Sequence, residues 1–158
     1  IRNGRFETRS AQTLMPLSQA SHRLHFATKG KAFVEITREL RAWLRSLSAE
    51  DGLLTVFVRH TSASLVIQEN ADPNVRVDLM AVLERFAPES ANYVHHEEGP
   101  DDMPSHIKAM LTAVSLPIPV AGGEMVLGTW QGVYLIEHRS APHRRELVLS
   151  FIGECAGG

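Results

Sequence analysis

Apolar residues recur with helical spacing in two long segments of this chain. Between residues 35 and 47, hydrophobic side chains return every three or four positions, which is typical of an amphipathic helix. A second apolar stripe runs from residue 75 to residue 86. Pro73 suits the first position of that helix, and Asp72 before it suits the N-cap. The pattern therefore predicts two amphipathic helices.

A third, shorter helix is predicted within residues 101–113, after a polar loop rich in histidine and carboxylates. Asp102 and Ser105 are its two candidate N-caps. The side chains expected to face the core are those of Ile107, Met110 and Leu111.

Short apolar or alternating runs, bounded by Gly, Pro and polar clusters, predict strands in the rest of the chain. We expect strands at residues 11–17, 22–27, 53–60, 64–69, 116–120, 124–127, 132–138 and 146–154. Because these strands are mixed irregularly with three helices, the order favours an α+β fold with largely antiparallel sheets over regular βαβ winding. The length of 158 residues, with no linker or internal repeat, predicts a single domain over residues 1–158.

Composition narrows the partners that this chain is expected to have. Its 16 basic and 18 acidic side chains give a formal net charge of -2, so no overall attraction to nucleic acid or to an anionic membrane is expected. No apolar run approaches the roughly 20 residues that cross a bilayer, and the start of the chain lacks the apolar core of a signal peptide. We therefore expect a cytoplasmic protein. Cys155 is the single cysteine, which excludes an internal disulfide and a cysteine-based zinc site.

Two polar side chains interrupt apolar strand faces. Strand alternation places His60 on the same face as Val58, and Glu69 on the same face as Ile67. A buried carboxylate is costly unless it has a cationic, metal or hydrogen-bonding partner. A half-buried histidine bonded to a backbone carbonyl explains His60 by itself, but two interruptions so close together favour a shared polar pocket. Asp72 follows shortly after, and helix capping explains it while a role in the pocket stays open.

Histidine and carboxylate side chains crowd into the segment from 95 to 106, which contains His95, His96, Glu97, Glu98, Asp101, Asp102 and His106. Imidazole together with carboxylate suits a borderline divalent metal such as zinc, or a general acid–base pair that titrates near neutral pH. His95 and His96 are adjacent and point to opposite sides of an extended chain, so at most one belongs to a site. Asp102 and His106 share a helix face if the helix begins early enough. A solvated acidic loop is the alternative interpretation.

Two polar stretches follow in the C-terminal half, GTWQG at 128–132 and EHRSAPHRR at 137–145. In the first, Gln131 offers an amide donor and acceptor beside the flat surface of Trp130. In the second, the arginines after the predicted strand suit a phosphate or carboxylate held by forked hydrogen bonds. A charged hairpin end explains the second stretch equally well.

Three long motifs occur in this order along the chain: HTSASLVIQENADPNVRVD, HHEEGPDDMPSHIKAML and LGTWQGVYLIEHR. They resemble the YjbQ family, also described as secondary thiamine-phosphate synthase enzymes, over about residues 20 to 154. The resemblance implies a small α+β domain that assembles as a homotrimer, with a polar pocket near subunit boundaries and often a bound metal or anion. Its recurring polar positions fall on His60, Glu69, Asp72, His95, Asp102, His106, Gln131 and Glu137, with an arginine after the last strand turn. The chain departs from the family pattern at His96 and at SAPHRR, so the choice between Arg144 and Arg145 stays open.

The activity attached to the family joins a hydroxymethylpyrimidine diphosphate to a thiazole phosphate, releasing pyrophosphate and yielding thiamine phosphate. By resemblance we expect a metal-assisted enzyme for small phosphorylated substrates, with a divalent ion, zinc or magnesium, as cofactor. The expected metal ligands are His60, His95 and His106, the expected catalytic residues are His60, Glu69, Asp102 and Gln131, and the expected substrate contacts are Glu137, Arg139 and Arg145. The alternatives are a metal-dependent phosphate or ester hydrolase and a non-catalytic trimeric module that binds a small anion.

Overall fold

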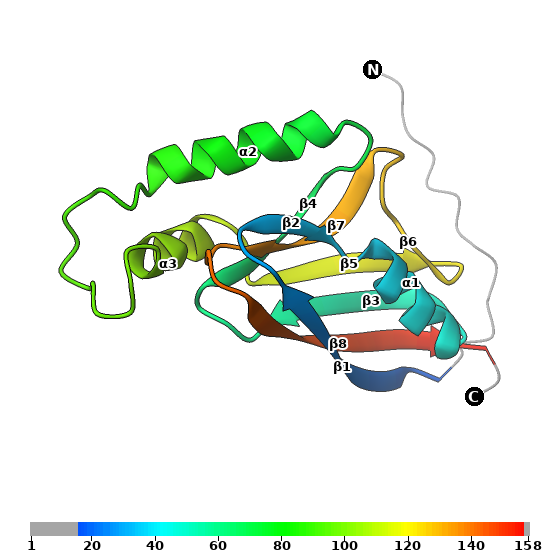
Figure 1. The fold of residues 1–158 in the computed structure, drawn as a ribbon. Coiled ribbons are helices and arrows are strands. Elements are labelled where there is room, and N and C mark those ends of the chain that lie inside the picture. Colours follow the sequence, from blue (N-terminus) through cyan, green and yellow to red (C-terminus); the bar gives the residue numbers. More distant parts are fainter. Residues whose placement is uncertain (1–15, 157–158) are drawn as a thin grey trace, which may run out of the picture.

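Two antiparallel sheets and three helices make up residues 16–156, the part of the chain that the computed structural model describes (Figure 1). The larger sheet has the order β1 (Ser18–Thr28), β8 (His143–Cys155), β3 (Ala49–Val58), β5 (Ser115–Ala121) and β6 (Glu124–Met125). The smaller sheet has the order β2 (Ala32–Glu35), β7 (Gln131–Glu137) and β4 (Ala63–Glu69). All pairings between these strands are antiparallel. The predicted α+β fold with a single domain is thus confirmed.

One hydrophobic core lies between the two sheets and α1 (Thr37–Ser46). Val56 of β3 and Leu135 of β7 are fully buried, and so are Leu40 and Leu44 one helical turn apart on α1. Burial of one such side chain contributes about 1.5–3 kcal/mol. This core fixes the strands, and so it fixes the points at which the polar loops leave them.

Helices α2 (Pro73–Phe86) and α3 (Asp102–Leu111) lie together, away from α1 (Figure 1). Asp72 caps α2 as predicted, because its Oδ1 accepts a hydrogen bond from the backbone N–H of Asn74 at 2.8 Å. The two helices are joined by an ion pair between Glu84 of α2 and the buried Lys108 of α3, with 2.6 Å between Nζ and Oε1.

The third helix is present, but its predicted cap and inward face are wrong. Its N-cap is Asp101 rather than Asp102 or Ser105, and that cap has no side-chain hydrogen bond to the helix. Met110 is 76% exposed, and Leu111 and Ile107 are also not buried. The helix packs instead through a stripe of small and polar side chains that includes Asp102, Ser105 and Ala109. Polar contacts to the segment after β7 set this orientation of the helix. The spacing of apolar residues in the sequence does not indicate those contacts.

The strand predictions differ from the structure mainly at the N-terminal side. Residues 11–15 of the predicted strand 11–17 lie outside the described part of the chain. Residues 16–17 are described, and they precede β1 without belonging to it. The prediction at 22–27 is confirmed as part of β1. Strand β2 was not predicted, since its few residues run directly into α1 and show no separate pattern. Strand β3 ends at Val58, so His60 lies just beyond it.

Within residues 16–156, the helices are too short or too polar to cross a membrane.

Candidate metal centre

Three side chains converge where the long polar loop enters α3. His95 comes from the loop, Asp102 is the first residue of α3, and His106 lies one turn later on the same face. The Oδ2 atom of Asp102 is 2.7 Å from His95 Nε2 and 3.2 Å from His106 Nε2. One ligand atom from each residue lies within 4.8 Å of the others, which is the spacing of a shared metal ion. The early helix start thus brings together the pair that the sequence left conditional.

His106 has a fixed tautomer in its neutral form. Its Nδ1 lies 3.1 Å from the carbonyl oxygen of Thr61, and a carbonyl only accepts hydrogen bonds. Nδ1 therefore carries the proton, and the lone pair of Nε2 faces Oδ2 of Asp102. Two acceptors face each other there, which is an arrangement that a bound cation would stabilise. A backbone carbonyl bound to the far ring nitrogen is also the usual support of a metal-binding imidazole.

The neighbouring histidine lies outside this cluster. His96 is exposed, and its Nδ1 bonds the carbonyl of Val94 at 2.8 Å. The prediction that at most one of His95 and His96 joins the cluster is confirmed.

Asp102 is held in place from its other side by Arg139. The Asp102 side chain is 2% exposed, and Nη1 of Arg139 donates to its Oδ1. The same guanidinium donates through Nη2 to the carbonyl of Glu98 at 2.8 Å and lies 3.3 Å from Asp101 through Nε. Oδ1 of Asp102 is thereby occupied, which leaves Oδ2 for the two imidazoles. Nη1 and Nη2 of Arg139 are therefore engaged by the protein, whereas its buried Nε has no hydrogen-bond partner among the described residues.

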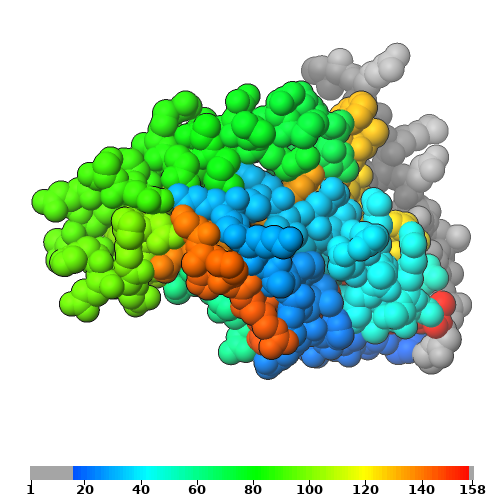
Figure 2. Space-filling view, viewed as in Figure 1, coloured from blue at the N-terminus to red at the C-terminus, as the bar shows by residue number. Residues whose placement is uncertain are grey.

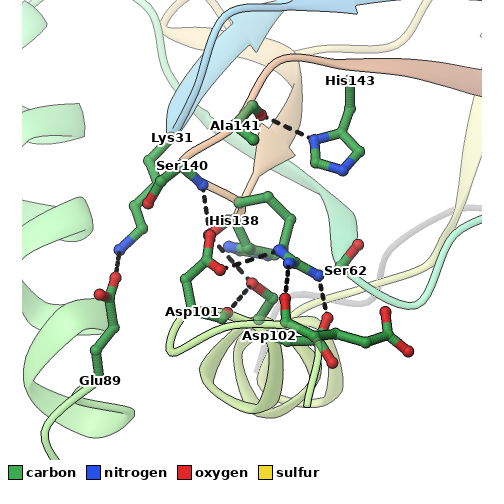
Figure 3. A network of polar contacts seen from close by, with 12 residues as sticks. Lys31, Ser62, Glu89, Asp101, Asp102, His138, Ser140, Ala141 and His143 are labelled. Carbon is green, nitrogen blue, oxygen red and sulfur yellow. Dashed lines mark hydrogen bonds and ion pairs between the residues drawn. The ribbon is translucent and has the colours of Figure 1, made fainter. Parts of the chain in front are cut away.

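Asp101 fastens the segment after β7 to the start of α3. Its Oδ2 accepts the backbone N–H of Ser140 at 2.7 Å, as Figure 3 shows. Burial raises the pKa of this carboxyl, but the Ser140 amide and Arg139 outweigh burial and hold it below its usual value. In Figure 2 the orange segment after β7 lies at the surface between the blue N-terminal strands and the yellow-green α3. The sequence placed Asp101 in the cluster but gave it no role.

Glu137 and Arg145 form a buried ion pair beneath this segment. They are 0% and 3% exposed, and Arg145 donates through Nε and Nη2 to the two carboxylate oxygens at 2.7 and 2.5 Å. Thr28 Oγ1 and the backbone N–H of Arg139 complete the shell of Glu137 at 2.7 and 2.9 Å. Burial raises the pKa of Glu137, yet these donors hold it below its usual value. Of the two candidate arginines, Arg145 lies inside and Arg144 is exposed.

His60 is placed apart from the three converging side chains. Its Nε2 accepts the backbone N–H of Glu146 at 2.8 Å, and burial and the nearby Arg145 lower its pKa. His60 and His106 are among the residues that line a groove of about 590 Å³, here called the apolar groove. The residues that line the apolar groove are Phe57, Val58, Arg59, His60, Thr61, His106, Ala109, Met110 and Val114. A second pocket of about 430 Å³, lined by His95 and loop residues, is more polar.

Glu69 and Gln131 lie at the far end of the smaller sheet. In the pairing of β4 with β7, Glu69 lies opposite Gln131 at one end and Ala63 lies opposite Glu137 at the other end. The two ends are about 20 Å apart. Gln131 closes a turn, because its Oε1 accepts the backbone N–H of Gly128 at 2.8 Å. Glu69 Oε1 accepts the backbone N–H of Asp72 at 3.3 Å. Within one chain these two residues are therefore not brought together with His95, Asp102 and His106.

His138 is a buried polar residue that the sequence reasoning missed. It is 0% exposed, its Nε2 lies 2.8 Å from Ser64 Oγ, and its Nδ1 has no partner among the described residues. Burial, together with Lys108, lowers its pKa to about 4. Its signal in the sequence is weak, because it ends an apolar run between Glu137 and Arg139 and has no role of its own within the EHRSAPHRR stretch.

Comparison with known proteins identifies the family. Residues 22–154 match the model of the family described as UPF0047 protein YjbQ-like. A UPF0047 protein of Synechocystis sp. is 47% identical over 143 residues, which cover 87% of this chain and 97% of the relative. The UPF0047 protein YjbQ of Salmonella typhimurium is 45% identical over 127 residues, covering 80% and 92%.

Solved structures agree with that match. A conserved hypothetical protein of Thermus thermophilus superposes with a TM-score of 0.72 at 38% identity, covering 81% of this chain and 97% of that chain. A YbjQ-like protein of unknown function from Sulfolobus solfataricus shares the fold, with a TM-score of 0.82 at 21% identity over 88% of this chain and all of that chain. This chain belongs to the UPF0047 protein YjbQ-like family.

Proposed function

We propose that this protein is a divalent-metal-dependent enzyme that acts on small phosphorylated molecules, with thiamine-phosphate synthesis as the specific activity. The observation that carries the proposal is the convergence of His95, Asp102 and His106, in which an imidazole lone pair faces a carboxylate oxygen at 3.2 Å. A divalent ion between them relieves that conflict. Three protein ligands leave coordination positions open for a substrate, which is typical of catalytic rather than structural zinc sites.

The ligand set favours zinc over magnesium. Two imidazole nitrogens and one carboxylate suit a borderline ion, whereas magnesium prefers oxygen ligands. His60, which the sequence reasoning placed among the ligands, is replaced in this proposal by Asp102. Since Oδ1 of Asp102 is held by Arg139, the carboxylate would bind through Oδ2 alone.

A bound divalent ion would supply charge stabilisation for phosphate oxygens and for a departing pyrophosphate. The chain's own residues do the positioning. Arg139 fixes the carboxylate, Thr61 fixes the ring of His106, and the apolar groove beside His106 offers Phe57 and Val58 as walls for a flat ring. This arrangement suits a substrate with an anionic phosphate at one end and a planar, largely apolar ring at the other.

The test joins metal analysis to an activity assay. Purified protein, loaded with zinc or magnesium, is incubated with hydroxymethylpyrimidine diphosphate and thiazole phosphate, and thiamine phosphate and pyrophosphate are quantified. We expect zinc to bind at one ion per chain and product to form with it. His106→Ala should lose both, while His96→Ala, a change of the adjacent exposed histidine, should keep both and serves as the matched control.

The outcomes separate the rival functions. Zinc binding without thiamine phosphate would refute the synthase assignment, and zinc-stimulated release of phosphate from a panel of esters would then favour the hydrolase. Ligand-dependent thermal stabilisation without any turnover would favour the small-anion-binding module. If the wild-type protein binds zinc no better than His106→Ala does, the proposal of a metal-dependent function is refuted.

A homotrimer is part of the same proposal. Exposed apolar side chains at the rim of the groove, among them Phe57 at 43% and Met110 at 76%, support burial against another copy. Sedimentation equilibrium at micromolar concentration should give three times the mass of one chain, and a monomer there would count against the assembly.

A further inference from the structure

We propose that His60 is a fixed, neutral hydrogen-bond donor that recognises an acceptor atom on the ring of the molecule in the apolar groove. The identity of that molecule rests on the proposed function, but the state of His60 does not. This role differs from metal ligation and from acid–base catalysis, the two roles that the sequence suggested for His60.

The backbone N–H of Glu146 determines the tautomer of His60. It lies 2.8 Å from Nε2, and an amide N–H only donates, so Nε2 must keep its lone pair as the acceptor. The proton of the neutral ring is then on Nδ1. Because β8 is paired with β3 on one side and β1 on the other, the Glu146 amide is part of a rigid strand and holds the ring in one orientation.

The surroundings of His60 oppose a second proton on the ring. Protonation of Nε2 would set two hydrogens against each other across the 2.8 Å bond to Glu146. Burial and then Arg145 have the largest effects and lower the pKa of His60, Glu137 and Glu146 raise it by less, and His143 lowers it slightly. The neutral ring is therefore the form present near neutral pH.

Nδ1 is the ring atom left for a ligand. Among residues 16–156, the recorded hydrogen bond of the His60 ring is the one that Nε2 accepts, and His60 is one of the residues that line the apolar groove. Two other side-chain nitrogens of the groove, one on Arg59 and one on His106, are engaged by the protein. Arg59 donates to Glu146 at 2.7 Å, and Nδ1 of His106 donates to Thr61. An N–H held in one orientation within a mostly apolar wall favours a ring that carries an acceptor atom.

The chemistry of the proposed coupling reaction indicates which of the two substrate rings would contact His60. In the coupling reaction the thiazole nitrogen uses its lone pair to attack, and a hydrogen bond to that lone pair would oppose the bond being formed. A pyrimidine has ring nitrogens whose lone pairs take no part in the reaction. His60 would therefore hold the pyrimidine, and the diphosphate attached to that ring would extend toward the side of the groove formed by His106.

The tautomer is tested without any substrate. In the full chain labelled with ¹⁵N histidine, two-dimensional NMR that correlates ring nitrogens with ring carbon-bound protons distinguishes the two neutral tautomers and the imidazolium. We expect His60, assigned by comparison with His60→Gln, to show a protonated Nδ1 and a bare Nε2 near neutral pH. A protonated Nε2, in either the other tautomer or the imidazolium, would overturn the inference.

Recognition is tested with two probes, pyridin-3-ylmethyl phosphate and benzyl phosphate, which differ by one ring nitrogen. We expect the zinc-loaded protein to bind the pyridyl probe about tenfold more tightly, the worth of one good neutral hydrogen bond. His60→Gln keeps an acceptor for the Glu146 amide but has nothing at the position of Nδ1, so the preference should vanish. His60→Asn, whose amide reaches the Nδ1 position, should restore part of it, and His143→Ala should leave it unchanged.

The results also separate this inference from the proposed function. A pyridyl preference that persists in His60→Gln comes from the metal ion or another group, and it refutes recognition by His60. If His60→Gln loses the preference and the wild-type protein makes no thiamine phosphate, recognition by His60 is supported while the synthase assignment fails. If neither probe binds the wild-type protein, the groove is not the phosphate-ring site, and the recognition role fails with it.

Discussion

Replacing Glu137 by glutamine tests whether this residue supports the fold or contacts a substrate. Glu137 is fully buried and accepts hydrogen bonds from both donor atoms of Arg145, from Thr28 Oγ1 and from the Arg139 backbone. Glutamine has the same shape but loses the charge, and its NH₂ group faces donors. Arg145, which is 3% exposed, is then left as a buried cation without its partner.

The expected loss is large because a broken buried pair leaves an uncompensated charge. That cost is about 3–5 kcal/mol, a substantial part of the roughly 5–15 kcal/mol that keeps a domain folded. For a chain of this size it corresponds to a fall in Tm of about 6–20 °C. Circular dichroism during heating and urea unfolding measures both quantities. The matched control is Glu124→Gln, because Glu124 pairs with Arg45 at the surface, where such a pair is worth about 0–1 kcal/mol.

The pH dependence of Glu137→Gln provides a second, independent check. Burial raises the pKa of Glu137, but Arg145, Thr28 and the Arg139 amide hold it below the usual 4.5. The ionised carboxylate therefore stabilises the fold fully above pH 4.5, and this contribution is lost as the pH falls through the folded pKa. Glu137→Gln should lack that part of the acid sensitivity. A variant as stable as Glu124→Gln, with unchanged acid sensitivity, would refute the structural role and return Glu137 to the substrate site.

Three further changes probe separate contacts. His106→Ala should weaken zinc binding by more than about 100-fold in a competition assay with a chelator, whereas His96→Ala should leave it within a factor of two, because His106 faces Asp102 and His96 bonds the Val94 carbonyl instead. Burial lowers the pKa of His138 from 6.5 to about 4, so the neutral ring contributes fully to the stability of the fold above pH 6.5, and this contribution is lost as the pH falls toward 4. In His138→Gln, the unfolding free energy measured with urea should therefore depend less on pH over that window. Asp72→Ala removes the cap of α2 and should cost about 1 kcal/mol of unfolding free energy, while a loss of zinc binding in that variant would contradict pure capping.

Much of the fold was predictable because its signals are local. The helix with Leu40 and Leu44 and the cap at Asp72 are each specified by residues close in sequence. The early start of α3 was not predictable in this way, because Asp101 is fixed by Ser140, far along the chain. The outward position of Met110 follows from the polar contacts of α3 with the segment after β7, and the spacing of apolar residues does not indicate it.

The candidate site was predictable as a set of residue types but not as an arrangement. The crowding of His95, Asp102 and His106 along the chain was visible, and their convergence follows from one helical turn and one loop. His60 looked equivalent to them, yet its Nε2 is occupied by a backbone amide of β8. Only strand pairing across the sheet shows that contact. Chemical type alone therefore does not show which of these side chains converge.

The two adjacent aspartates at the start of α3 show how one local feature serves both the fold and the site. Asp101 binds the Ser140 amide and so holds the segment after β7, while Asp102 turns one oxygen to Arg139 and the other to the two imidazoles. Arg139 contacts both carboxylates, and its own backbone N–H is held by Glu137. The buried pair of Glu137 and Arg145 is thus linked to Oδ2 of Asp102 through a short series of contacts. For that reason a change in the buried pair would reach the candidate metal ligands by displacing Arg139, although neither residue of the pair touches them.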